Sequence, residues 1–169
     1  MIFTIIPNRN CNLYCSYCYQ EKKKNIVMSD TTITKTCDFI RKKSILSNNK
    51  IIKINISGGE CLIYPEKIKN IISQLRKTEV EMENKIFEIE VSTNITLLTE
   101  NMIIFFKKNH ISLFLSFDGI KKSHNLNRTS FNKKTDTYKI CNDKLYLLNK
   151  YKLKNIVLNS VITNNNIIY

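Results

Sequence analysis

Three cysteines stand close together near the start of the chain, as Cys11, Cys15 and Cys18. Their C-x3-C-x2-C spacing directly follows an apolar run, and a segment this short can direct three sulfurs at one point by wrapping as a loop around a metal centre. Iron–sulfur clusters are held by cysteine thiolates, normally four for a [4Fe–4S] cube. Three ligands leave one iron open, and an open position separates catalytic metal sites from closed structural ones. We therefore expect a [4Fe–4S] cluster whose fourth iron binds a small molecule.

A zinc site and buried core thiols are the alternatives for these cysteines. Zinc could use three thiolates and a water, but neither histidine of the chain, His110 or His124, is close in sequence. The remaining cysteines are scattered, and we expect Cys37, Cys61 and Cys141 to be small buried residues. Clustered cysteines in a chain without a signal peptide favour a metal site over disulfides.

Polar residues also follow the later predicted strands. Gly58 and Gly59 are two of the three glycines in the chain, and Glu60 follows them. In so glycine-poor a sequence, this pair indicates a close approach of backbone that other residues would block. Residues 92–94 and 116–128 occupy the same position after later strands. Because the carboxyl ends of parallel strands carry the chemistry of α/β proteins, we expect one site built from four loops.

Short apolar runs alternate with helical patterns, which predicts an α/β fold with parallel strands and right-handed crossovers. We expect a single domain, residues 1–169. Strands are expected at residues 1–7, 51–56, 86–91, 111–117 and 156–162. Helices are expected to begin after the cap Ser29, at Pro65 and after the cap Thr99. The apolar face of the first should hold Ile33, Cys37, Ile40 and Leu46, and a last helix should carry Tyr138, Cys141, Leu145 and Leu148 at helical spacing.

The composition is that of a globular protein with a net charge of +13. The excess is almost all lysine and is spread along the chain, whereas a nucleic-acid footprint should be a patch or stripe. Nucleic acid is therefore not the favoured partner. No window approaches the ~18 consecutive apolar residues of a membrane span, and no signal peptide precedes the first strand, so we expect a cytoplasmic protein that does not enter a membrane.

The nine residues from Cys11 to Tyr19, together with Ser-Gly-Gly-Glu after the second strand, resemble the radical S-adenosylmethionine (SAM) superfamily. Leu115–Gly119 and His124–Arg128 resemble its branch of anaerobic sulfatase-maturating enzymes and SPASM-type radical peptide maturases. The resemblance runs from about Phe3 to the end of the chain and covers the N-terminal core of those enzymes. It implies a partial parallel (β/α) barrel with about five βα units here, lacking the sixth. We interpret Asp118-Gly119 itself mainly as a turn.

The resemblance also implies roles for individual residues. Cys11, Cys15 and Cys18 would each ligate an iron, and the amine and carboxylate of SAM would chelate the fourth iron. Positions that contact SAM in the family match Tyr17, Gly58, Gly59, Glu60, Asn94, Ser116 and Arg128. Tyr17 would lie against the adenine, and the Gly-Gly-Glu segment would receive the methionyl amino group. Ser116 and Arg128 would contact the ribose and carboxylate of SAM. Asn94 would line the same pocket.

By this resemblance the chain is an enzyme that cleaves SAM reductively to a 5′-deoxyadenosyl radical, which removes hydrogen from a peptide or protein side chain. Its partners would be that substrate and a one-electron donor such as flavodoxin or ferredoxin. Two alternatives remain. The net charge motivates an RNA-modifying radical SAM enzyme. The missing sixth unit motivates a truncated, non-catalytic cluster-binding remnant or subunit, in which case a partner chain would complete the barrel.

Overall fold

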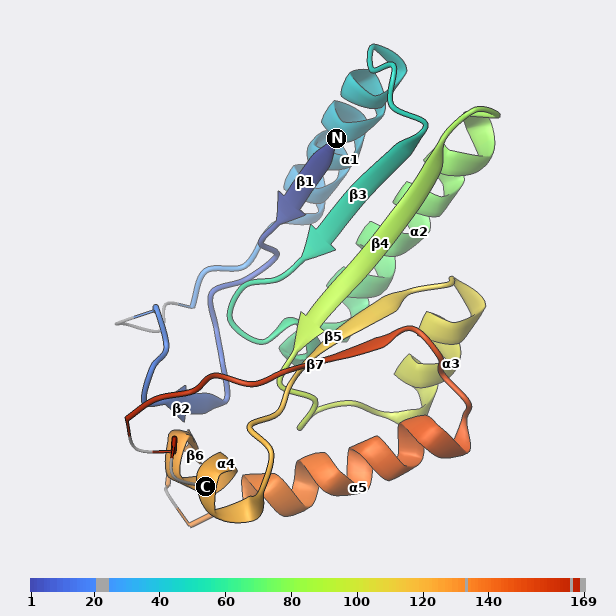
Figure 1. Ribbon diagram of the computed structural model, residues 1–169. Helices are drawn as coiled ribbons and strands as arrows, with labels where there is room; N and C mark the ends of the chain where they lie inside the picture. The colour runs from blue at the N-terminus through green and yellow to red at the C-terminus, as the bar shows by residue number, and fades with distance from the viewer. Residues whose placement is uncertain (21–24, 133, 165, 168–169) are drawn as a thin grey trace.

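A parallel sheet of five strands forms the centre of the computed structural model, which describes residues 1–20, 25–132, 134–164 and 166–167. The strands lie in the order of the chain: β1 (Ile2–Ile5), β3 (Ile51–Ile56), β4 (Ile86–Thr93), β5 (Ser112–Ser116) and β7 (Ile156–Asn159). Each strand pairs in parallel with its neighbour. The predicted α/β fold and partial parallel barrel are confirmed (Figure 1).

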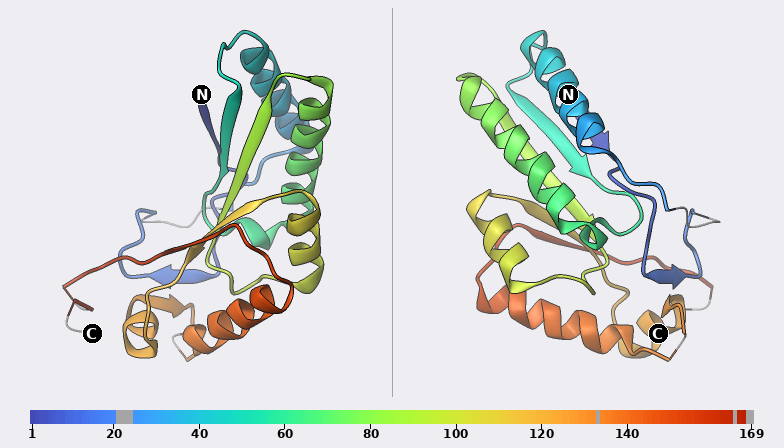
Figure 2. Two further views of the ribbon diagram at one scale, coloured as in Figure 1. Left: turned by 45° about the vertical axis from the view of Figure 1, so that its right-hand side comes forward. Right: turned by 180° about the vertical axis from the view of Figure 1, so that it is seen from behind.

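Helices connect successive strands along the chain. They are α1 (Asp30–Ile45), α2 (Pro65–Glu81), α3 (Glu100–Lys108), α4 (Lys121–Asn127) and α5 (Thr137–Lys150), with a short 3-10 helix η1 (Cys61–Ile63) before α2. The α4 helix lies beside β6 (Arg128–Ser130), beyond the carboxyl ends of the sheet strands (Figure 1). Figure 2 shows α1 and α2 in front of the strands when the molecule is seen from behind, with α5 running along the lower edge below β7. None of the helices in the described ranges has the length and apolarity needed to cross a membrane.

The core lies between the sheet and these helices. Side chains of the central strands point inward in alternation and are fully buried, and the helices supply the facing layer. The set includes Ile52, Ile54, Ile56, Phe87, Ile89, Val91, Leu113 and Leu115 from the strands and Ile33, Ile40, Ile68, Ile72 and Leu75 from the helices. Each such side chain contributes about 1.5–3 kcal/mol on burial, which fixes the strand ends that carry the site.

The predicted helix starts are confirmed by their caps. The hydroxyls of Ser29 and Thr99 accept hydrogen bonds from the backbone of α1 and α3, and Pro65 is the first residue of α2. One assignment on α1 is wrong, and β7 ends at Asn159, short of the predicted residue 162. Leu46 does not join the apolar face of α1, because the helix ends at Ile45 and the Leu46 side chain is 79% exposed.

The cysteine segment is not the simple loop that we predicted. Leu13–Cys15 forms a short strand, β2, which pairs antiparallel with β6 (Arg128–Ser130) so that Cys15 stands opposite Arg128. Three residues are too few to show strand periodicity in a sequence, although the buried Leu13 and exposed Tyr14 do alternate. The β2–β6 ribbon lies beyond the carboxyl ends of β1, β3 and β4 (Figure 1).

Candidate cofactor site

A cavity of about 400 Å³ opens at the carboxyl ends of the strands. Its wall combines the cysteine segment with residues at the carboxyl ends of β3, β4 and β5 and with Arg128, as the spacing of the polar clusters predicted, and it adds Asn159 and Val161 from the end of β7. The residues expected to bind cofactors that line it are Cys11, Cys15, Tyr17, Cys18, Gly58, Gly59, Asn94, Ser116 and Arg128. Glu60 is not among the lining residues.

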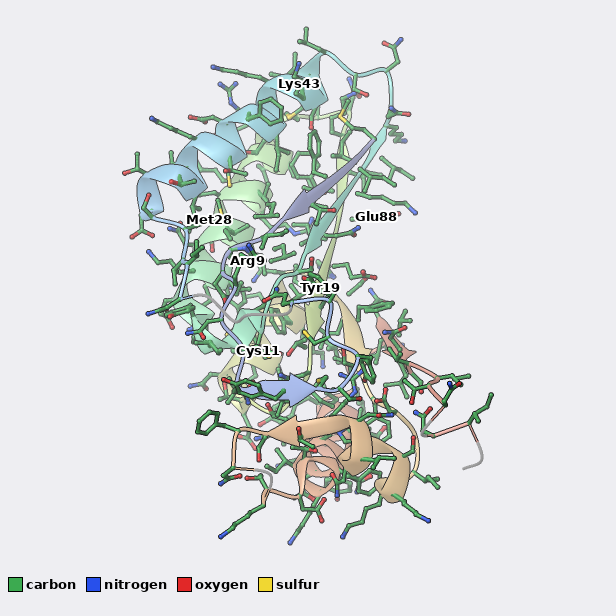
Figure 3. The ribbon with its side chains drawn as sticks, turned by 90° about the vertical axis from the view of Figure 1, so that its left-hand side faces the viewer. Arg9, Cys11, Tyr19, Met28, Lys43 and Glu88 are labelled. Atoms are coloured by element: carbon green, nitrogen blue, oxygen red, sulfur yellow. The ribbon has the colours of Figure 1, made fainter. Side chains whose placement is uncertain are left out.

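Hydrogen bonds to α4 and strand pairing with β6 hold the cysteine segment in place. The backbone nitrogen of Ser16 donates to the carbonyl of Asn127 at 2.9 Å, and the Ser16 hydroxyl bonds the Asn127 side chain at 2.8 Å. A tight turn follows, because the nitrogen of Cys18 donates to the carbonyl of Cys15 at 3.1 Å. In Figure 3, Cys11 and Tyr19 lie on the side of β2 that faces the sheet. The three thiols therefore face the cavity from a braced segment.

The three thiols are half-buried, and all three line the cavity. In the described part of the chain, no three His, Cys, Asp or Glu side chains are grouped to hold a single metal ion. A four-iron cube binds each thiolate through a different iron, so its ligands surround a volume. The arrangement of Cys11, Cys15 and Cys18 suits such a cluster better than a zinc ion.

The paired glycines are required by packing against the segment that leads into the cysteines. A Cβ on Gly58 would stand 2.4 Å from the carbonyl oxygen of Asn8, and one on Gly59 would stand 2.0 Å from that of Asn10. Gly58 also has φ +147°, a conformation that L side chains rarely adopt. The predicted close approach at the glycines is thus confirmed. The group that comes close is the main chain at Asn8 and Asn10. This contact places the loop after β3 beside the cysteines.

Glu60 lies behind the cavity wall and is fully buried. Its carboxylate accepts hydrogen bonds from the backbone nitrogen of Leu62 at 2.9 Å, the hydroxyl of Thr93 at 2.6 Å and the backbone nitrogen of Asn94 at 2.7 Å. Burial raises its pKa, and these bonds oppose the increase. Three internal donors occupy this carboxylate, so its contact with the amino group of SAM stays a prediction that this geometry does not favour.

Asn94 brings an amide donor to the first cysteine. Its Nδ2 lies 3.8 Å from the sulfur of Cys11 and donates to the Asn12 side chain at 3.0 Å. Its Oδ1 accepts from the backbone and hydroxyl of Thr96, at 3.1 and 2.6 Å. Hydrogen bonds near cluster sulfurs tune reduction potential, so Asn94 is placed to affect the cluster as well as to line the pocket.

Tyr17 and Arg128 both line the cavity, and both form hydrogen bonds to the carboxylate of Asp118. The Tyr17 hydroxyl donates to the Asp118 carboxylate at 2.5 Å, and Arg128 Nη2 pairs with the same carboxylate at 3.1 Å. The guanidinium also stacks over the Tyr17 ring, 5.4 Å from its centroid. Burial and the bond to Asp118 raise the pKa of Tyr17, which keeps the phenol protonated. The Nε atom of Arg128 is buried without a hydrogen-bond partner among the described residues, so the guanidinium retains capacity for an anionic group.

Several lining residues were given no role in the sequence analysis: Tyr19, Ser57, Phe114, Asn159 and Val161. Tyr19 directly follows the last cysteine, and its hydroxyl donates to the carbonyl of Gly58 at 3.1 Å. Ser57 is the first residue of the Ser-Gly-Gly-Glu motif, and Phe114 directly precedes the Leu115–Gly119 motif. Asn159 and Val161 had no signal, because they belong to the site only through the pairing of β7 with β5.

The scattered cysteines lie in the core, as predicted, and His124 is also buried. Cys61 and Cys141 are fully buried, and their thiols donate to the carbonyls of Ile56 and Asn94 at 3.7 and 3.4 Å. Burial raises the pKa of Cys141 to about 12 and that of Cys61 well above its usual value. His124 is buried against Phe117, with Nδ1 accepting from the nitrogen of Asp118 at 3.3 Å.

The residues present fit a [4Fe–4S] cluster with bound SAM. Three thiols line a cavity that extends past them toward the loops after β3, β4 and β5, so a ligand on the open side of a cluster would meet those loops. The partnerless Nε of the buried Arg128 suits a carboxylate, and the Tyr17 ring offers an aromatic face.

Comparison with known proteins agrees with this geometry. The profile of the radical SAM superfamily matches residues 5–166. The cysteine-type anaerobic sulfatase-maturating enzyme of Clostridium novyi is 28% identical over 162 residues, which are 92% of this chain and 42% of that protein. The serine-type enzyme of Bacteroides thetaiotaomicron is 30% identical over 122 residues, covering 68% of this chain and 28% of the relative.

Solved structures give the same result. The structure of native anSMEcpe with bound AdoMet and Cp18Cys peptide has a TM-score of 0.84 and 26% identity, over 97% of this chain and 44% of that one. Streptococcus suis SuiB, bound to its precursor peptide SuiA, shares the fold with a TM-score of 0.71 at 17% identity. This chain spans less than half the length of the first of these relatives. Its sequence, fold and cysteine-lined cavity place it in the radical SAM superfamily, whose members use a [4Fe–4S] cluster and SAM.

Proposed function

We propose that this chain binds a [4Fe–4S] cluster and SAM and initiates radical modification of a peptide or protein side chain. The observation that carries the proposal is one cavity that joins the three cysteines to Tyr17, Ser116 and Arg128. When bound, the cluster and SAM supply reductive cleavage of a carbon–sulfur bond and a hydrogen-abstracting radical. A peptide substrate is favoured because the related anSMEcpe structure contains a peptide.

The protein's part in this chemistry is binding, orientation and exclusion of water. Cys11, Cys15 and Cys18 hold the irons from a segment braced by β6 and α4. Arg128 binds the carboxylate of SAM through the part of its guanidinium that Asp118 leaves open. The amino group of SAM binds at the Gly58–Gly59 segment, since these residues line the cavity and the Glu60 carboxylate is occupied.

An external one-electron donor, such as flavodoxin or ferredoxin, completes the proposal. We also propose a cytoplasmic location, because the thiols of a metal site require a reducing compartment.

The test is anaerobic reconstitution of the purified chain with iron and sulfide. We expect an EPR-active cluster, SAM binding, and 5′-deoxyadenosine formation when a strong reductant is added. A well-formed cluster that binds SAM but never cleaves it would assign the chain to the non-catalytic alternative. For the RNA-modifying alternative, the corresponding test is retention of tRNA that weakens steeply as salt rises.

A further inference from the structure

Asp118 lies behind the wall of the cofactor cavity and bonds to three separate segments of it. One carboxylate oxygen, Oδ2, accepts from the hydroxyl of Tyr17 at 2.5 Å. The other, Oδ1, accepts from Nη2 of Arg128 at 3.1 Å and from the backbone nitrogen of Val161 at 3.2 Å. The Asp118 side chain has no exposed surface and does not itself line the cavity.

All three partners do line the cavity, and they come from different parts of the chain. Tyr17 lies between the second and third cysteines, Arg128 begins β6, and Val161 follows β7. β7 is an edge strand of the sheet, so the segment after it has a neighbouring strand on one side only. The bond from Val161 to Asp118 fastens that segment to the loop after β5.

Asp118 is itself held in place. Its backbone nitrogen donates to Nδ1 of the buried His124 at 3.3 Å, and the preceding nitrogen, of Phe117, donates to the carbonyl of Asn159 at 2.9 Å. A buried carboxylate is tolerated when charged and neutral donors satisfy it, and here one guanidinium, one phenol and one amide do so. Its position therefore determines where the other three groups stand.

We propose that Asp118 is a positioning residue for SAM: it fixes the ring of Tyr17, the guanidinium of Arg128 and the Val161 segment around the ligand without touching it. This inference rests on the proposed function, because it presupposes that SAM occupies the cavity. With the carboxylate removed, Arg128 loses its buried counter-charge and the Tyr17 ring loses its anchor, while the cysteine ligands keep their own supports at β6 and α4.

The experiment measures the dissociation constant of SAM for the reconstituted full chain by anaerobic equilibrium dialysis, with iron content determined on the same samples. The variants are Asp118→Asn, Tyr17→Phe and the double substitution, with Asp143→Asn on the exposed face of α5 as the matched control. We expect about a tenfold weaker affinity for Asp118→Asn and about threefold for Tyr17→Phe, which keeps the ring but not the anchor. The double variant should bind no more weakly than Asp118→Asn alone, because the phenol acts through Asp118.

Iron content separates positioning from a general structural role. We expect Asp118→Asn to retain the iron content of the wild type, whereas a collapsed site would lose iron and SAM affinity together. If both single variants bind SAM as the wild type does, the inference is overturned. Should Asp118→Asn fail to fold, Tyr17→Phe decides alone, and wild-type affinity for it would overturn the inference. Failure of the wild type to bind SAM would instead refute the proposed function.

Discussion

The carboxylate of Glu60 accepts a hydrogen bond from the backbone nitrogen of Asn94 across 2.7 Å, which joins the loop after β3 to the loop after β4. Both loops reach the cysteine segment. The nitrogen of Glu60 donates to the carbonyl of Asn10 at 2.7 Å, and the amide of Asn94 lies beside the sulfur of Cys11. Glu60 is thus a support shared by two walls of the cavity.

Substitution of Glu60 by Gln should destabilise the fold. The three groups around the carboxylate are all donors in these bonds, and an amide would direct its own N–H groups at one of them. A buried donor left without an acceptor costs about 1–3 kcal/mol, so we expect the free energy of unfolding in urea to fall by that amount.

The matched control is Glu88→Gln on β4, where an exposed pair with Lys53 at 3.7 Å contributes little. Figure 3 shows Glu88 well away from Cys11. Unchanged stability of Glu60→Gln combined with lost SAM affinity would contradict this account and support direct contact with the amino group of SAM.

Substitution of Gly59 by Ala should cost more than the same change at Gly119. The new Cβ at Gly59 would lie 2.0 Å from the Asn10 carbonyl oxygen, whereas at Gly119 no atom lies within 4 Å. Gly119 has φ +76°, so Ala there carries only conformational strain of about 1–2 kcal/mol. At Gly59 main-chain atoms must move, and we expect a loss of about 3 kcal/mol or more in urea unfolding. Equal losses for the two variants would refute the packing argument.

Local signals in the sequence predicted much of this fold, and long-range pairing explains what they missed. Ser29, Pro65 and Thr99 mark helix starts through bonds or geometry within a few residues, so their positions were predictable. The β2–β6 ribbon joins segments more than a hundred residues apart along the chain, and neither segment is long enough to show a period.

For the site too, local motifs predicted one part, and contacts between residues far apart in the sequence explain the part that was missed. The cysteine spacing and the paired glycines identified the cavity, but the turn interpretation of Asp118 was incomplete. Its partners Tyr17, Arg128 and Val161 are 101, 10 and 43 residues away in sequence. The position of Glu60 behind the wall likewise depends on Thr93 and Asn94 at the end of another strand. A sequence motif identifies such residues, but it does not specify the direction in which their side chains point.

Replacement of a motif cysteine by Ala should prevent cluster assembly. Each of Cys11, Cys15 and Cys18 lines the cavity, and a cube with only two protein thiolates has too few ligands to be retained. We expect the iron and sulfide content after anaerobic reconstitution to fall to a small fraction of the wild-type value in each variant. Cys37→Ala is the control, because Cys37 is buried on α1 and should leave iron content unchanged. Wild-type iron content in any of the three motif variants would exclude that residue as a ligand.

The buried His124 should make the fold sensitive to mild acid. Burial, followed by the nearby charge of Arg128, lowers its pKa from 6.5 to about 4, while Asp118 and Asp136 oppose the shift. Between these values the unfolded chain binds a proton that the folded chain does not, so stability is lost as pH falls from about 6.5 toward 4. The shift corresponds to about 3 kcal/mol, and solvent screening of the surrounding charges reduces the expected effect to about 1–2 kcal/mol.

The measurement is urea unfolding at several pH values between neutral and 4 for the wild type, His124→Asn and His110→Asn. Asn can accept the bond from the Asp118 nitrogen through its side-chain oxygen but cannot take up a proton, so His124→Asn should lose part of the acid sensitivity. His110 is exposed and has a positive φ that Asn tolerates, so His110→Asn should keep the wild-type pH dependence. Parallel pH profiles for the wild type and His124→Asn would show that His124 is not the group that titrates.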